Sequence, residues 1–164
     1  MRFPILLILL SGTLTVSTTI AQSPDHAAIE ANIRQVFAGM EKGDSVMVHQ
    51  SFSKQVTMAT VKTNKEGKLE LAMESSIGPW LASIGTPHAD KYYEEIWGIK
   101  TSIDGAFAQV WCDYAFYIGN KFHHCGVDAF QLSKDSGSWK IFHVADTRRT
   151  MACDVPAGIQ AKHK

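Results

Sequence analysis

The chain has 164 residues, with 16 basic and 16 acidic side chains and a formal net charge of zero. Because no basic stripe runs along it, nucleic acid and anionic membrane surfaces are poor candidates for partners. Three cysteines in this length exclude a fold built on a network of disulfides, so a hydrophobic core has to supply the stability.

The first 21 residues predict a secretory signal peptide. Arg2 precedes a short apolar run from Phe3 to Leu10, and Ala21 is the small residue before a cleavage point. The run is too short, and residues 11–19 are too rich in Ser and Thr, to span a bilayer as a stable helix; an uncleaved anchor is the alternative. We therefore expect a secreted or periplasmic protein, free of the membrane after cleavage, with a single domain over residues 22–164.

The cysteines are expected to meet an oxidising compartment. Cys112, Cys125 and Cys153 allow at most one disulfide within the chain, and the sequence leaves its pairing open. Three buried free thiols are the alternative, since cysteine is often buried in this form.

A helix is predicted directly after the signal peptide. Ser23 can cap it, and Pro24 suits its first position. Apolar residues at helical spacing form one stripe to be buried: Ile29, Ile33, Val36, Phe37 and Met40. Gly43 ends this helix, and a short second helix is expected between Asp44 and Phe52.

Most of the remaining chain predicts antiparallel sheet. We expect a hairpin from residues 55–63 and 68–72, then a third short helix around Trp80. Four long strands come after it at about residues 92–103, 106–118, 121–132 and 139–147, with turns at Asp104-Gly105, Gly119-Asn120 and Lys134–Ser138. Helices first and a long meander afterwards predict an α+β fold, in which N-terminal helices pack on a long curved sheet.

The turns allow an estimate of which side chains share a face of the sheet. A two-residue turn at Gly119-Asn120 sets Trp111 opposite Asp128, and pairing of Leu132 with Trp139 sets Asp128 opposite His143. One face then has the character of a cavity wall, aromatic with a few polar groups. Its candidate ligand contacts are Trp111, Asp113, Tyr117, His124, Asp128, Phe130 and His143.

The opposite face of the sheet is also apolar. It would carry Tyr114, Phe116, Phe142 and Val144. Such a patch is larger than monomers usually expose, which predicts a homodimer formed sheet to sheet.

Asp128 and His143 are the candidates for acid–base catalysis, because a carboxylate can orient an imidazole that moves a proton. The alternative is a buried pair that merely fixes the strand register.

Neither a metal nor a cofactor is expected. His123 and His124 are neighbours on a strand, so their side chains should point to opposite faces and cannot chelate one ion. Asp146 and Arg148, at the end of the last strand, are expected to form a local salt bridge at the mouth of the cavity.

The order of elements and a C-terminal motif resemble a known superfamily. The motif comprises His124, Gly126, Val127, Asp128, Phe130, Leu132, Trp139-Lys140-Ile141 and Asp146-Thr147-Arg148. In these features the chain resembles the nuclear-transport-factor-two-like (NTF2-like, SnoaL-like) superfamily with its cone-shaped, cystatin-like fold, and within it bacterial proteins named for lumazine binding. The resemblance implies a conical pocket but no particular reaction, because this fold hosts isomerases, dehydratases, hydrolases and non-catalytic binders.

The run Val127-Asp128-x-Phe130 also resembles a strand of ketosteroid isomerases. Those enzymes use a protonated aspartic acid, a tyrosine and a second aspartate that moves the proton. Asp128 is similar to the first of these. Val36 stands where the tyrosine is expected, and residues 54–58 contain no carboxylate, so the resemblance does not extend to that reaction.

The leading hypothesis is a secreted protein that binds a small apolar or aromatic molecule in a conical pocket. One alternative is a cofactor-independent isomerase or dehydratase that uses Asp128 and His143, and another is a non-catalytic dimerisation module. Binding leads because the sequence pattern reveals no second, separately tuned carboxyl group to act as a base.

Overall fold

A computed structural model describes residues 23–164, and the predicted signal peptide lies outside the described residues. Three helices belong to the N-terminal half of the fold: α1 (Pro24–Lys42), α2 (Ser45–His49) and α3 (Gly78–Gly85). The hydroxyl of Ser23 accepts a hydrogen bond from the backbone of His26, and Asp44 caps α2 in the same way. No helix in residues 23–164 is long and apolar enough to cross a membrane.

In the part of the chain that the structure describes, six strands form a single sheet. They are β1 (Phe52–Thr63), β2 (Leu69–Glu74), β3 (Tyr92–Asp104), β4 (Phe107–Ile118), β5 (Lys121–Asp135) and β6 (Ser138–Arg148). Their order across the sheet is β2-β1-β6-β5-β4-β3. β1 runs parallel to β6, and all the other neighbours are antiparallel.

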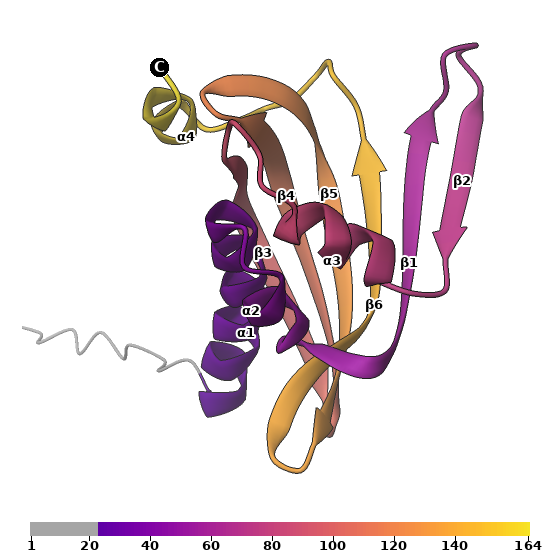
Figure 1. The fold of residues 1–164 in the computed structure, drawn as a ribbon. Helices are drawn as coiled ribbons and strands as arrows, with labels where there is room; N and C mark the ends of the chain where they lie inside the picture. Colours follow the sequence, from indigo (N-terminus) through magenta and orange to yellow (C-terminus); the bar gives the residue numbers. More distant parts are fainter. Residues whose placement is uncertain (1–22) are drawn as a thin grey trace, which may run out of the picture.

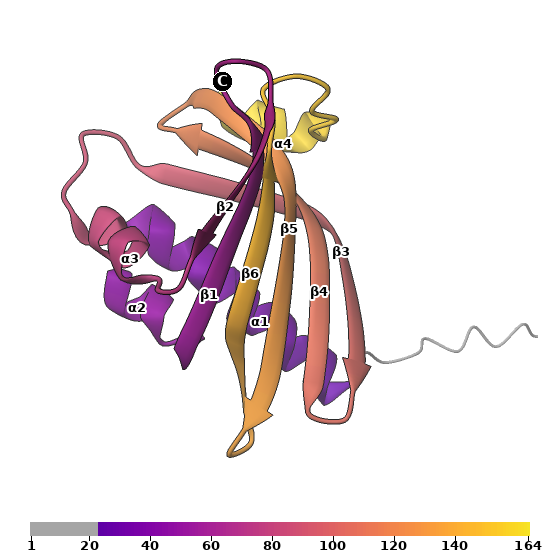
Figure 2. The ribbon, with the colours of Figure 1, turned by 90° about the vertical axis from the view of Figure 1, so that its right-hand side faces the viewer.

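The strands curve around the three helices, which lie together on one face of the sheet (Figure 1). We call this the inner face and the opposite one the outer face. In the view turned by 90°, no helix stands in front of the outer face of β1, β6 and β5 (Figure 2). The fold therefore encloses space on one side of the sheet and leaves much of the other side open.

The main hydrophobic core fills the space between α1 and the inner face. Ile29, Ile33 and Val36 of the predicted stripe are at most 1% exposed. They belong to the same buried cluster as Val110, Leu132 and Ile141 of the sheet. The helical periodicity of the sequence thus identified the side of α1 that supports the sheet.

A short fourth helix, α4 (Ala157–Lys162), was not expected from the sequence. A disulfide between Cys125 of β5 and Cys153 holds the segment that leads to it, and Cys112 is a buried free thiol among the described residues. Behind the disulfide, the ring of His163 stacks on Tyr117 at 3.9 Å, and its Nε2 lies 3.2 Å from Oε1 of Glu95. This C-terminal segment covers one end of the outer face.

The predicted register of β4 against β5 is wrong by one residue beyond the turn. The two-residue turn at Gly119-Asn120 is present, since Ile118 pairs with Lys121. A β-bulge comes directly after it, in which Tyr117 pairs with Phe122 but Phe116 pairs with His124, so His123 has no partner. The extra residue shifts the pairing of β4 with β5 by one position. Every β4 side chain beyond the bulge therefore lies on the face opposite to the predicted one.

A second bulge lies between β5 and β6. The turn there is shorter than predicted, because Asp135 pairs with Ser138 across Ser136-Gly137, both of which have positive φ. Further along, Leu132 pairs with Ile141 while Gln131 pairs with His143. The two effects together place Asp128 opposite Asp146, and not opposite His143 as the sequence pattern suggested.

Gly126 is required where β4, β5 and β6 meet. A Cβ atom at this position would lie 2.7 Å from the ring of Tyr114 and would overlap the carbonyl oxygen of Thr147. Glycine therefore lets the Tyr114 ring lie across the backbone of β5, so that its hydroxyl reaches β6. This places a phenol on the inner face, close to Asp146.

Candidate functional site

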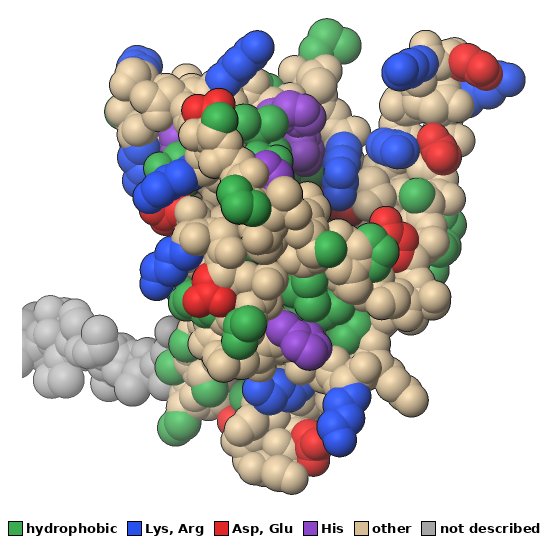
Figure 3. All heavy atoms as spheres, in the orientation of Figure 1, with side chains coloured by type: hydrophobic (Ala, Val, Ile, Leu, Met, Phe, Trp, Pro, Cys, Tyr) green, Lys and Arg blue, Asp and Glu red, His purple; other side chains and the backbone are tan. Residues whose placement is uncertain are grey.

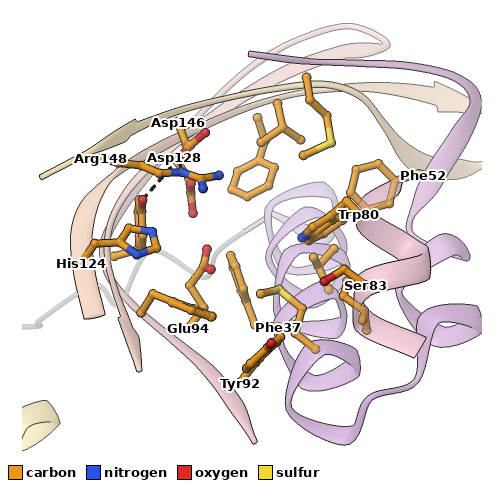
Figure 4. A pocket seen from close by; sticks show the side chains of 18 residues that line it. Phe37, Phe52, Trp80, Ser83, Tyr92, Glu94, His124, Asp128, Asp146 and Arg148 are labelled. Carbon is orange, nitrogen blue, oxygen red and sulfur yellow. Dashed lines mark hydrogen bonds and ion pairs between the residues drawn. The ribbon is translucent and has the colours of Figure 1, made fainter. Parts of the chain in front are cut away.

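A cavity of about 210 Å³ lies between the helices and the inner face of the sheet. Its apolar part is lined by side chains of α1, α3, β1 and neighbouring strands: Val36, Phe37, Met40, Phe52, Met58, Trp80, Ile84, Phe116, Phe130 and Val144. Its polar side chains are Ser83, Tyr92, Glu94, Tyr114, His124, Asp128, Asp146 and Arg148. In Figure 4, Glu94, His124, Asp128, Asp146 and Arg148 lie toward one end, and Ser83 lies on the other side of the cavity beside Trp80. Figure 4 shows the carboxyl groups of Glu94 and Asp128 directed into the same space, with aromatic rings across from them.

The sequence identified three of the cavity residues and misplaced four. His124, Asp128 and Phe130 line the cavity. Trp111 is 46% exposed on the outer face, and Asp113 lies on the same face opposite Val127. Tyr117 packs under α4, and Nδ1 of His143 lies 2.7 Å from Oγ1 of Thr57.

Most of the residues that the sequence placed on the face opposite the cavity are found in the cavity. Tyr114, Phe116 and Val144 line the cavity and do not face outward. Phe142, the extra residue of the second bulge, lies near Phe107, with 6.3 Å between the ring centroids. The shorter turn and the bulge between β5 and β6 set His143 opposite Gln131, so the predicted Asp128–His143 pair does not exist.

Asp146 and Arg148 form the salt bridge that the sequence predicted. Nε of Arg148 lies 2.6 Å from Oδ2 of Asp146, and the hydroxyl of Thr60 donates to the other carboxylate oxygen at 2.5 Å. The hydroxyl of Tyr114 donates to the carbonyl of Thr147 at 2.9 Å and lies 3.3 Å from Asp146. Both oxygens of Asp146 are therefore bonded, and its charge balances the positive charge that Arg148 brings to the cavity.

Asp128 has no such support. It is 4% exposed, and its Oδ2 is a buried atom without a hydrogen-bond partner among the described residues. Burial raises the pKa of Asp128 well above its usual range, and the charges of Glu94 and Asp146 raise it further. The cross-strand pairing of Asp128 with Asp146 contributes directly, since like charges on opposed strand residues repel.

Glu94 is the functional candidate that sequence reasoning missed. Burial first, and the charge of Asp146 second, raise the pKa of Glu94 to about 7. Its neighbour Glu95 points the other way and pairs with Lys162 at 2.7 Å. A signal was present in the sequence, because two adjacent acids on a predicted strand must place one side chain on each face.

His124 stands near the mouth of the cavity as a neutral group. Burial, together with the positive charge of Arg148, lowers the pKa of His124 to about 4. Its Nδ1 lies 2.7 Å from Nδ1 of His123, and the two rings are 5.0 Å apart. The expectation that these neighbours point to opposite faces is therefore wrong, because His123 occupies the bulge.

The described residues contain no group of three or more His, Cys, Asp or Glu side chains that could hold a metal ion. Cys112 lies on β4 directly opposite Asp128, and burial raises the pKa of its thiol, which keeps it protonated. What the cavity offers chemically is thus a pair of proton-binding carboxyl groups, a neutral imidazole, two phenols and the Asp146–Arg148 ion pair against an apolar wall.

Comparison with known proteins shows which known fold the chain shares. No family model matches the chain, and no curated protein matches it. Among solved structures, an NTF2-like protein of unknown function from Shewanella baltica is 23% identical, with a TM-score of 0.60 over 82% of this chain and 99% of that one. An NTF2-like protein with a cystatin-like fold from Novosphingobium aromaticivorans is 14% identical, with a TM-score of 0.63 over 84% and 87% of the two chains.

A proposed dehydratase of the NTF2-like family from Streptomyces avermitilis is 14% identical, with a TM-score of 0.58 over 78% of this chain and 99% of that one. The chain therefore has the NTF2-like, cystatin-like fold, as the resemblance implied. These likenesses concern the fold, whose members differ in function. The resemblance to proteins named for lumazine binding stays a prediction.

Proposed function

We propose that this protein binds a small, largely apolar or aromatic molecule in its cavity, with Glu94 and Asp128 as the groups that meet its polar end. The observation that carries the proposal is the buried, unpartnered Oδ2 of Asp128 at the end of an otherwise apolar cavity. An orphaned buried carboxyl oxygen costs about 1–3 kcal/mol or more, which a ligand that satisfies it would recover. Apolar pockets with a few convergent polar groups are the usual form of small-molecule sites.

A neutral bicyclic probe, 1-naphthalenemethanol, should therefore bind in the cavity. Val144→Trp should abolish binding, because the indole would occupy the space that the probe needs. Val61→Trp is the matched control, since Val61 lies on the outer face, where it pairs with Leu71 and Thr147. Calorimetry with folded proteins checks this, and equal binding by both variants would contradict the cavity as the site.

Proton-transfer catalysis is a second candidate function, and the observation that favours it is the presence of Glu94 in the same cavity as Asp128. Two carboxyl groups with raised pKa values in one apolar cavity suit a division into base and acid. Ionised Glu94 would take a proton from a carbon next to a carbonyl group while protonated Asp128 gives its proton to the carbonyl oxygen. The product is an enol. If Glu94 then gives its proton to a different carbon of the conjugated system while Asp128 takes back the proton of the enol oxygen, an isomerisation is complete without a cofactor.

If so, the protein should exchange the acidic protons of 2-tetralone for deuterium in heavy water. The rate should rise as the pH passes about 7, because Glu94 acts as a base only after it has lost its proton. Glu94→Gln should lower the rate about 100-fold or more, in the range that removal of a general base produces. Nuclear magnetic resonance follows the exchange directly.

Glu70→Gln provides the control for that experiment. Glu70 is exposed on the edge strand β2 and does not line the cavity, so the substitution makes the same change in charge outside it. If the wild-type protein exchanges these protons no faster than buffer alone does, the proposed catalysis is excluded and the proposed binding function is unaffected.

We also propose that the protein is a homodimer, through an outer-face surface different from the one that the sequence indicated. One cross-strand row on this face runs Met73, Ala59, Ala145, Ala129 and Trp111. Its two end residues are 61% and 46% exposed, and the three between them are alanines. Large side chains at both ends of a shallow row are self-complementary across a twofold axis.

Hydrophobic side chains also run along the outside of the β1–β2 hairpin, whose turn end stands apart from the rest of the molecule (Figure 3). Leu69 and Leu71 are 78% and 62% exposed there.

Ala129→Glu should convert the dimer to a monomer, because it places a charge in the middle of the row, and light scattering would show the change in mass. Ala72→Glu, on the opposite face of β2, is the control, and a wild-type monomer at micromolar concentration would refute the proposal.

We further propose that the protein is exported and cleaved near Ala21. The disulfide between Cys125 and Cys153 supports this, since disulfides persist mainly in oxidising compartments. The intact mass of protein recovered from the compartment outside the cytoplasm should lack the first 21 residues. Recovery of mature protein that still begins at Met1 would contradict the proposal.

A further inference from the structure

The charges that face the cavity do not balance. β6 contributes Asp146 and Arg148, which are paired with each other at 2.6 Å. β3 contributes Glu94, and β5 contributes Asp128 and the neutral His124. The lining residues of α1, α3 and β1 include no ionisable group. Glu94 and Asp128 are thus two acids that share the cavity with no cation of their own.

Other groups near the pair do not correct this imbalance. Arg34 of α1 and Lys162 of α4 line a second cavity beside Glu94, but Arg34 is bonded to Glu30 and Lys162 to Glu95, each at 2.7 Å. Burial raises the pKa values of the Tyr114 phenol and the Cys112 thiol, so neither group carries a charge at neutral pH. Any positive charge to match the pair therefore has to come with the ligand.

The rest of the cavity suits a cation with an apolar body. Aromatic rings stand edge to face in three pairs along its wall: Phe37 with Phe130, Phe52 with Trp80, and Tyr92 with Phe116. The faces of such rings attract cations, most strongly when water is excluded. At about 210 Å³, the cavity exceeds the roughly 150 Å³ that holds benzene, so a bicyclic ring system is a suitable size.

We propose that the natural ligand is a small aromatic or apolar amine whose protonated nitrogen lies between Glu94 and Asp128. This deepens the binding function proposed above and rests on it. An ammonium group supplies three donors, which match the free Oδ2 of Asp128 and the neighbouring carboxyl group of Glu94, which has no cationic partner of its own. An anionic ligand would instead meet uncompensated negative charge, and a neutral alcohol could give only one donor.

Binding of an amine should depend on pH with a defined sign. In the free protein, the pair keeps a proton that an incoming ammonium group would displace. Affinity should therefore increase as the pH rises through about 7, until the amine itself loses its proton. A neutral ligand that accepts a hydrogen bond from the protonated pair should show the opposite trend.

Two probes of matched shape test the proposal: 1-naphthylmethylamine and 1-naphthalenemethanol. By calorimetry at about pH 8, the amine should bind at least about tenfold more tightly than the alcohol, since one charged hydrogen bond supplies this factor. The advantage should shrink at about pH 6, and protons should be released to the buffer on binding. This comparison needs only the wild-type protein.

Variants then assign the effect to the carboxyl pair. Asp128→Asn and Glu94→Gln should each remove most of the amine's advantage, and Glu70→Gln, on the exposed edge strand, should leave it unchanged. Equal affinity of the two probes, or tighter binding of the alcohol, would overturn the amine while keeping the binding site. Failure of both probes to bind would overturn the binding function itself.

Discussion

The placement of the half-buried Glu94 and the buried Asp128 in one cavity, without a counter-charge of their own, is the constraint on which the rest of the cavity depends. Removing a carboxylate from water is unfavourable unless hydrogen bonds or a cation replace the lost hydration. Asp146 has both, from Thr60 and Arg148. Asp128 lacks both at Oδ2, so the protein lowers the cost by retaining a proton at the pair. An energetically unfavourable arrangement of this kind is typical of functional sites and unusual in a core that serves stability alone.

The local backbone geometry creates this arrangement. The bulge at His123 turns Tyr114 and Phe116 inward, and the second bulge brings Asp146 opposite Asp128. Gly126 leaves room for the Tyr114 ring to cross β5. The same irregularities leave alanines and the exposed Trp111 on the outer face, so one set of backbone features determines both the cavity and the surface available to a second copy.

The fold could be predicted from the sequence because its signals are periodic or local. The stripe on α1, its Ser23 cap and the turn at Gly119-Asn120 depend on near neighbours and were predicted correctly. The faces of β4 and β6 were not, because a bulge adds one residue without any required sequence signature, and a single slip exchanges a whole face.

The residues of the candidate site also fall into those that could be predicted from local sequence and those that could not. His124, Asp128 and Phe130 lie on the cavity face, as predicted, because residues at even spacing on one strand share a face whatever register the neighbouring strands adopt; their contact with a ligand stays a prediction. Glu94 was missed because the face that it occupies depends on the pairing of β3 with β4, which lies beyond the first bulge.

Titration of the carboxyl carbons by nuclear magnetic resonance, with Glu94→Gln and Asp128→Asn used for assignment, tests the shared burial of the two acids most directly. We predict that Glu94 titrates near pH 7 and Asp128 well above the usual range of aspartate, and that removal of either one shifts the other downward. Independent titration of both groups at ordinary carboxylate values would mean that the pair is hydrated, and would contradict the role proposed for it.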